Sequence, residues 1–307
     1  MAKELSLALP PDLKRKKFDA LPYVLVSPAV IATLLVVFYP MLTAIGMSFY
    51  DYVVWKPASS KFLWFGNYVA ALKNELFWTS FKQTLIWIGV TVPLQLVLGL
   101  ATALLLNQKF AWRWLARMII IVPWALPSVV IALMWRWIYD ANYGVLNDTL
   151  LRLQLVNESI PWLSAPGTAL YSIILVLIWQ GFPFFAVMLL AGLQSIPKTH
   201  YEAAEVDGAS TWGKFVHVTL PGLKSVLVTS TLLRLIWVAN SVDVIYVMTE
   251  GGPGTSTYTL PLYAFAQSRK AMKYGYASAI AVLFTIMLLA LVVVYMRRID
   301  DKGGAKQ

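Results

Sequence analysis

Residues 169–193 read ALYSIILVLIWQGFPFFAVMLLAGL and contain no charged side chain. A helix needs roughly 20 apolar residues to cross the hydrocarbon core of a bilayer, and this stretch is long enough to do so. The strand of a membrane barrel would instead alternate apolar and polar residues over about ten positions. The stretch therefore predicts a membrane-spanning α-helix.

Comparable apolar runs lie on both sides of this stretch and extend the prediction to the whole chain. The chain is 59% hydrophobic and 13% charged, whereas soluble domains are about 25% charged. No small-residue cleavage site follows the first run, so we expect it to be retained. The sequence predicts an all-α integral membrane protein with six transmembrane helices, over residues 23–48, 79–106, 118–138, 169–193, 226–248 and 277–296.

The basic residues set the expected orientation. The net charge is +10, but Lys and Arg lie mainly in loops that flank the apolar runs, which argues against a nucleic-acid partner. With the N-terminus inside, cytoplasmic segments hold about twice as many Lys and Arg residues as the outer loops. We expect a multi-pass protein with both termini in the cytoplasm.

The segment between the fourth and fifth runs is polar and unlike the rest of the chain. Residues 202–209 read EAAEVDGA, and Pro221 precedes the fifth run. Glycine favours the turn that ends a helix, and proline is tolerated in the first turn of the next. The pattern predicts two short helices that turn at Gly208, with small alanine side chains that leave a flat surface for docking.

Residues 208–215 read GASTWGKF, one residue short of a phosphate-binding loop. Such a loop needs Ser or Thr where Phe215 stands, and a preceding strand. The chain has no Cys and only two His, both in this segment, so no catalytic group can be assembled. We expect no catalytic residue, no metal and no cofactor on this chain.

The spacing E-A-A-x-x-D-G-A, with Phe six residues on and then V-x-L-P, resembles the cytoplasmic loop of permease subunits of binding-protein-dependent ABC importers. The resemblance covers nearly the whole chain and implies the type I ABC importer permease fold. In that family the loop is a coupling helix that docks on the ATP-hydrolysing subunit. Carried over by position, the coupling residues are Glu202, Ala203, Ala204, Asp207, Gly208, Ala209, Phe215 and Pro221.

Smaller patterns resemble the maltose-type carbohydrate branch of this family and the larger permease of its heterodimers. They include Phe65-Gly66-Asn67-Tyr68 in the first outer loop and Gly251-Gly252-Pro253 in the last. The resemblance implies a second homologous permease, an ATPase dimer that holds ATP and Mg²⁺, and an extracytoplasmic solute-binding protein. It also implies a sugar or sugar-like substrate and a location among the lipids of the bacterial cytoplasmic (inner) membrane.

The resemblance and the apolar runs together suggest three parts. Residues 1–20 are expected to form a cytoplasmic tail and residues 300–307 a second one. Residues 21–299 are expected to form the permease domain, including the coupling loop at 198–222.

Polar side chains inside the runs indicate where a solute could pass, because such groups are costly in hydrocarbon. Arg234 lies near the middle of the fifth run. At 100° per residue it falls within about 120° of arc with Trp237, Asn240 and Ser241, a face that suits a sugar. In the fourth run Trp179, Gln180 and Gly181 offer similar chemistry. Alternatively, Arg234 pairs with a carboxylate or glutamine of the partner helix bundle.

Two other classes of protein compete with this interpretation. A self-sufficient secondary transporter of a polar solute would need a proton or sodium relay, for which the runs hold too few carboxylates. An integral membrane enzyme would need paired acids or another catalytic group.

Overall fold

A computed structural model of the chain describes residues 21–55 and 60–304. The predicted tail at 1–20 and residues 305–307 of the predicted C-terminal tail lie outside the described residues, while residues 300–304 continue the last helix. The chain divides into two compact units, residues 1–46 and residues 47–307.

The first unit contains the first predicted span. Helix α1 (Leu21–Thr33) runs through a π-helical turn, η1 (Leu34–Phe38), into α2 (Tyr39–Met47), whose last residue already belongs to the second unit. Together they form a helical run of 27 residues that is apolar enough to cross a membrane. The prediction of a helix over residues 23–48 is confirmed in its extent.

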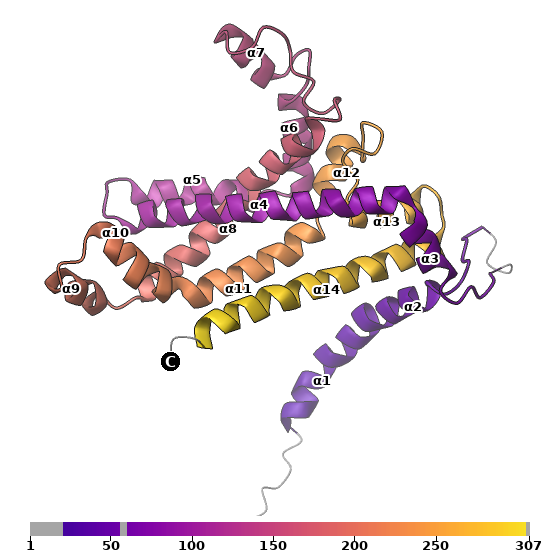
Figure 1. Cartoon of the computed structure of the whole chain (residues 1–307), viewed down its shortest axis with the longest axis horizontal. Helices are drawn as coiled ribbons and strands as arrows, with labels where there is room; N and C mark the ends of the chain where they lie inside the picture. Colours follow the sequence, from indigo (N-terminus) through magenta and orange to yellow (C-terminus); the bar gives the residue numbers. More distant parts are fainter. Residues whose placement is uncertain (1–20, 56–59, 305–307) are drawn as a thin grey trace, which may run out of the picture. The chain divides into compact units, whose positions relative to one another are not determined.

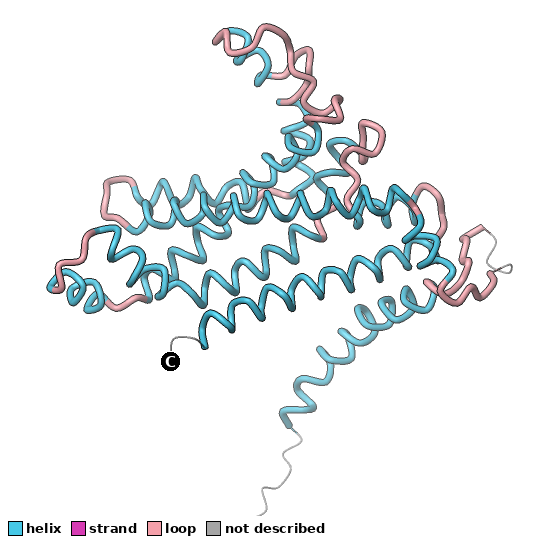
Figure 2. Tube along the Cα trace, in the orientation of Figure 1, coloured by secondary structure: helices cyan, strands magenta, loops and turns pink. Residues whose placement is uncertain are grey.

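Four long helices form the body of the second unit, α4 (Glu75–Asn107), α8 (Ala169–Ser195), α11 (Leu220–Ala239) and α14 (Tyr274–Gly304) (Figure 1). Helix α4 packs most extensively on α8. The described residues contain helices and loops but no strand, only isolated bridges at Tyr50–Phe62 and Val53–Lys273 (Figure 2). The all-α prediction is confirmed.

Shorter helices fill the connections between the long ones. In chain order, the shorter helices of the second unit are α3 (Gly66–Lys73), α5 (Arg113–Ala125), α6 (Ser128–Ile138), α7 (Val145–Arg152), α9 (Lys198–Val206), α10 (Thr211–Lys214), η3 (Phe215–Thr219), α12 (Asp243–Thr249) and α13 (Leu260–Arg269). Within the described residues, five helices are long and apolar enough to cross a membrane, or six if the α5–α6 pair is one span.

One of the six predicted spans is sharply bent. The run at 118–138 divides into α5 and α6, which meet at 94°. Pro127 follows the end of α5 and lacks the N–H that would continue the ladder. The run at 226–248 lies within one candidate span, Thr211–Thr249, in which α11 is followed by α12. The side-chain amide of Asn240 donates to the Ile236 carbonyl at 2.8 Å at the end of α11.

One face of α4 is polar and buried. Ser80, Thr84, Thr91 and Gln95 are each no more than 3% exposed. Thr84 Oγ1 accepts from the Leu260 amide at 2.9 Å, at the start of α13, and Trp87 Nε1 donates to the Val238 carbonyl at 2.9 Å, at the end of α11. Thr84 and Trp87 thus form hydrogen bonds with backbone groups that are left without a partner at the ends of other helices. Lipid hydrocarbon cannot form these bonds.

Close packing of α4 on α8 depends on Gly99. A Cβ at this position would collide with the Cβ of Phe185 and lie 3.0 Å from two backbone atoms, Ala186 N and Phe182 O. Small residues at helix contacts let backbones approach closely in membranes. The absence of a side chain at Gly99 therefore allows the short distance between the two helices.

We expect Gly99→Ala to destabilise the protein, because α8 backbone atoms would have to move, at a cost of about 1–3 kcal/mol. The measurement is the thermal unfolding midpoint of the detergent-solubilised protein. Gly89→Ala is the matched control on the same helix, since a Cβ there has no atom within 4 Å. Equal midpoints for the two variants would contradict the close approach.

Candidate coupling loop and translocation pathway

The predicted coupling residues lie on α9, α10 and η3, which together fold as a protruding loop. The loop lies at one end of the second unit, opposite α3 and α13, and α14 ends on the same side as the loop (Figure 1). Gly208 has φ +76°, in the left-handed region that glycine tolerates, and the chain turns there between α9 and α10. The two predicted short helices and the turn are confirmed.

Internal bonds hold the shape of this loop. Lys214 Nζ lies 2.6 Å from Glu205 Oε1, and Ser210 Oγ accepts from the Gly213 amide at 3.1 Å to cap α10. The hydroxyls of Tyr201 and Thr219 are 3.0 Å apart and join α9 to η3. The loop is therefore a folded element rather than a flexible connection.

The outer surface of the loop is exposed and partly apolar. Among the coupling residues, Glu202 and Asp207 are exposed and form no ion pair within the described residues. Val206 is 88% exposed and Trp212 is 71% exposed, with the Trp212 ring centroid 5.3 Å from that of Phe215.

The sequence analysis did not include Val206 and Trp212 among the coupling residues. Each is an apolar side chain in an otherwise polar short helix, and that pattern could have indicated an exposed apolar surface. The remaining coupling positions, Ala203, Ala204, Ala209 and Pro221, lie on the same loop and at the start of α11, exposed or half-buried.

Arg234, predicted to line the solute pathway, lies in a buried polar cluster between three helices. Its side chain is 92% buried, and its Nε donates to Gln95 Oε1 at 2.7 Å. Gln95 Nε2 in turn donates to the Leu177 carbonyl at 2.6 Å. Arg234 therefore pairs with a glutamine of this chain, whereas the predicted alternative was a group of the partner helix bundle.

Gly181 completes this cluster. A Cβ on Gly181 would collide with Arg234 Nη2 and with Gln95 Nε2, so the guanidinium and the amide occupy the space that a side chain would fill. Gly181 thus lies beside Arg234. Sequence reasoning did not place Gln95 against either residue, because the chain separates it from Arg234 by 139 positions.

The aromatic residues of the predicted pathway lie on surfaces of α8 and α11. The Trp237 side chain is 47% exposed, and its ring centroid lies 5.2 Å from that of Phe184. Trp179 packs edge-on against Trp135 at 5.6 Å and is half-buried, as is Gln180. These residues leave part of their surface open for a further contact.

Asn240 and Ser241 follow the last residue of α11. The backbone N–H of Asn240 still donates to the Ile236 carbonyl at 3.2 Å, whereas that of Ser241 donates to the Val238 carbonyl, so the 100° spacing holds to Asn240 and not to Ser241. The side chain of Asn240 also caps α11. Shortly after, Asp243 begins α12 and accepts from Ser128 Oγ at 3.0 Å, which joins the starts of α12 and α6.

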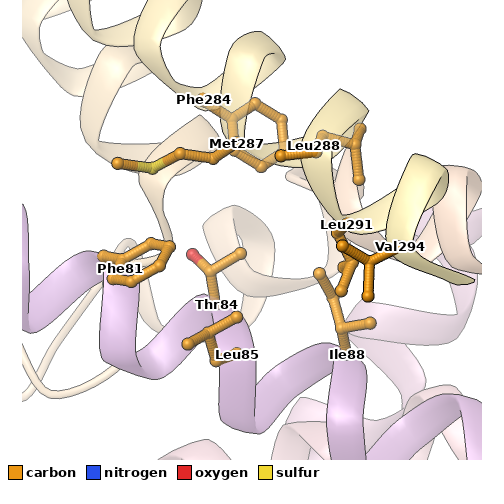
Figure 3. Close-up of a pocket in the computed structure, with 10 residues that line it drawn as sticks. Phe81, Thr84, Leu85, Ile88, Phe284, Met287, Leu288, Leu291 and Val294 are labelled. Carbon is orange, nitrogen blue, oxygen red and sulfur yellow. The ribbon is translucent and has the colours of Figure 1, made fainter.

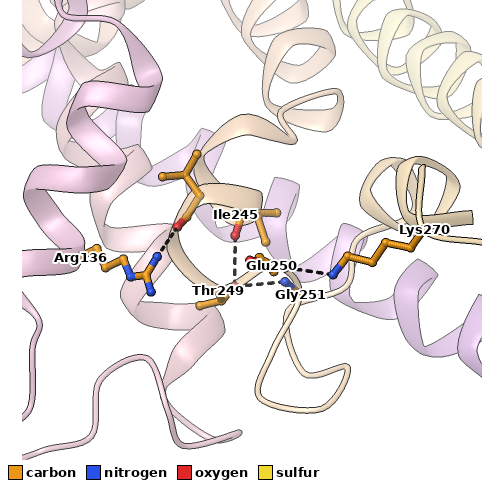
Figure 4. Close-up of polar contacts among 7 residues, drawn as sticks. Arg136, Ile245, Thr249, Glu250, Gly251 and Lys270 are labelled. Atoms are coloured by element: carbon orange, nitrogen blue, oxygen red, sulfur yellow. Dashed lines mark hydrogen bonds and ion pairs between the residues drawn. The ribbon is translucent and has the colours of Figure 1, made fainter. Parts of the chain in front are cut away.

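A polar cavity of about 430 Å³ lies beyond α12, beside the turn at Gly251–Gly252. Its charged groups are already engaged, because Lys270 Nζ pairs with Glu250 Oε2 at 3.0 Å and Arg136 Nη1 donates to the Val247 carbonyl at 3.4 Å (Figure 4). Sequence reasoning did not identify this cavity, since its lining comes from α6, α12 and the loop before α8.

A second cavity, of about 330 Å³, is apolar and lies between α4 and α14 (Figure 3). Phe81, Leu85 and Ile88 face Phe284 and Leu291 across it (Figure 3). The hydroxyl of Thr84 at its edge is already bonded to backbone groups at 2.7 and 2.9 Å. A polyhydroxylated solute would lose its hydrogen bonds there, so this cavity is unsuited to a sugar.

Within the described residues no three His, Asp or Glu side chains gather closely enough to hold a metal ion.

The sequence of this chain is similar to a known family of membrane proteins and to individual permease proteins. The model of the family "Binding-protein-dependent transport system inner membrane component" matches residues 95–303. The sulfoquinovosyl glycerol transport system permease protein SmoG of Agrobacterium fabrum is 38% identical over 92% of this chain and 91% of its own length. The trehalose/maltose transport system permease protein MalF of Thermococcus litoralis is 35% identical over 90% of this chain and 92% of its own length.

Among solved structures, a chain of a bacterial ABC transporter that imports the acidic polysaccharide alginate has the same fold. The TM-score is 0.80 at 22% sequence identity, over 92% of this chain and 96% of that one. The chain belongs to the inner membrane components of binding-protein-dependent transport systems, as a multi-pass permease subunit with the type I ABC importer fold.

Proposed function

We propose that this chain forms one half of the translocation pathway of an ATP-driven sugar importer. It pairs with a second homologous permease and is driven by two copies of an ATPase subunit, which hold ATP and Mg²⁺. An extracytoplasmic solute-binding protein delivers the solute. This chain itself binds no nucleotide and catalyses no reaction, and both of its termini lie in the cytoplasm.

The coupling loop is the observation that carries this proposal. It is internally bonded, yet Val206 and Trp212 present apolar surface to the cytoplasm. Burial of apolar area stabilises an interface by about 25 cal/mol per Å² before the costs of association are counted. The exposed carboxylates of Glu202 and Asp207 lie beside this surface and can pair with basic groups of an ATPase cleft.

Sugar as the solute is supported from two sides. The relatives are named for transport of sulfoquinovosyl glycerol and of trehalose or maltose. In this chain, Trp237 offers an aromatic surface to the apolar face of a sugar ring, and Arg234 and Gln180 offer hydrogen-bond donors to its hydroxyls.

Transport then proceeds by alternating access. When ATP closes the ATPase dimer, the coupling loops of the two permeases move together. The motion passes through η3 into α11, which carries Arg234 and Trp237. Because the loop and the pathway residues share one continuous chain segment, closure at the ATPase changes access to the solute site.

A secondary transporter remains the rival class. Such a protein needs an intramembrane carboxylate relay. Within the described spans, Glu75 stands at the first residue of α4, and Asp243 at the first residue of α12, where it binds Ser128. Neither carboxylate reaches the Arg234 cluster by a hydrogen bond or ion pair within the described residues.

We expect Glu202→Lys to abolish ATPase association, because it reverses an exposed charge on the docking surface without touching a bond inside the loop. The measurement is recovery of the ATPase subunit with the affinity-tagged chain, together with sugar uptake in cells. Lys109→Glu is the control, since Lys109 is exposed between α4 and α5, outside the coupling loop. Normal uptake and ATPase recovery with Glu202→Lys would refute the coupling role.

We expect Arg234→Ala to lower the number of solute molecules transported per ATP hydrolysed by roughly tenfold, since a charge-assisted hydrogen bond contributes about 1.5–3 kcal/mol. The assay uses proteoliposomes and a saturating concentration of the solute-binding protein. The binding protein carries whichever of maltose, trehalose and sulfoquinovosyl glycerol is transported best. ATPase stimulation by the binding protein should persist.

Leu233→Ala is the control for that experiment. Leu233 is 38% exposed and points about 100° away from Arg234 on the same helix. If Arg234→Ala kept the normal ratio of transport to ATP hydrolysis, Arg234 would have no role in solute binding.

A further inference from the structure

Gln95 is the only side chain to which Arg234 donates a hydrogen bond among the described residues. It is fully buried on the polar face of α4. The orientation of its amide follows from its two partners. A guanidinium can only donate and a backbone carbonyl can only accept, so Oε1 must face Arg234 and Nε2 must face Leu177. A flipped amide would lose both bonds.

This contact leaves one edge of the guanidinium available. The bond to Gln95 uses Nε, and within the described residues Nη1 and Nη2 have no hydrogen-bond partner and no carboxylate within 4.0 Å. The residue is 8% exposed, and a ligand that accepts from both nitrogens would add hydrogen bonds to a group that lies mostly out of solvent.

The position of that edge is fixed from two sides. The amide of Gln95 holds Nε, and the backbone of Gly181 lies against Nη2, where a Cβ would collide with it. Gln95 is itself held by the Leu177 carbonyl on α8, so α4 and α8 together orient a side chain of α11. The chain thus places a long, flexible side chain in one orientation before any solute arrives.

A neutral amide suits this arrangement better than a carboxylate. A glutamate at position 95 would compensate the charge of Arg234 and compete for a bidentate contact with its terminal nitrogens. Glutamine accepts one hydrogen bond and leaves the positive charge and the terminal edge for another acceptor.

We infer that Gln95 is a positioning residue that orients the free edge of Arg234 toward the hydroxyl oxygens of the transported sugar. This inference rests on the proposed role of Arg234 in solute binding. Gln95 itself does not contact the solute. Its effect on transport therefore passes entirely through Arg234.

A double-mutant cycle tests this dependence. Gln95→Met keeps the length of the side chain and removes both hydrogen bonds. In the proteoliposome assay we expect it to lower transport per ATP hydrolysed about fivefold, the equivalent of one hydrogen bond. In the Arg234→Ala background we expect the same substitution to change the ratio by less than about twofold, because no guanidinium remains to be positioned.

Gln95→Glu provides a second variant that keeps an acceptor facing Arg234. We expect it to lower transport per ATP as well, since its carboxylate would hold the guanidinium and repel the Leu177 carbonyl. Copurification of the ATPase and its stimulation by the binding protein should be normal in each variant.

The outcomes separate the two proposals. If Arg234→Ala itself leaves transport per ATP unchanged, the solute role of Arg234 is wrong. If Arg234→Ala lowers the ratio but Gln95→Met does not, or lowers it equally in both backgrounds, Gln95 supports the helices rather than Arg234 and the inference is overturned.

Discussion

The structure depends on one constraint, that backbone polar groups in hydrocarbon must find partners within the protein. The bend between α5 and α6 and the junction of α11 with α12 free N–H or C=O groups inside the bundle. Helix α4 satisfies part of this need, because Trp87 Nε1 donates to the Val238 carbonyl at the end of α11. In the same way Thr84 accepts from the Leu260 N–H at the start of α13. An apolar helix in its place would leave these ends unsatisfied.

The same polar face of α4 continues to Gln95 and reaches the only arginine in the middle of a described long span. The face that completes the backbone of neighbouring helices therefore also holds the most costly side chain of the bundle. Close contact with α8 is part of this arrangement, since Gly99 and Gly181 provide room for backbone and side chain respectively. The proposed role of Arg234 in solute binding places structural and functional demands on the same stripe of α4.

The fold class and the coupling loop could be predicted from sequence because both are local signals. Continuous hydrophobicity identifies the spans, and the spacing from Glu202 to Pro221 lies within one segment. The end of α11 at Ala239 was not predicted because residues 244–248 keep the run apolar on average despite Asn240, Ser241 and Asp243, while the capping of α11 by Asn240 requires a three-dimensional view. The contact of Gln95 with Arg234 joins distant helices, and hydropathy carries no information about such pairs.

The central claim is that this chain works only as part of an ATP-driven complex. The most direct measurement is affinity purification of the tagged chain from its native membrane, with identification of the proteins that travel with it and transport assayed on the purified sample. The account predicts recovery of an ATPase subunit and a second permease, with uptake that requires ATP. A chain that purifies alone and transports sugar without ATP would contradict it.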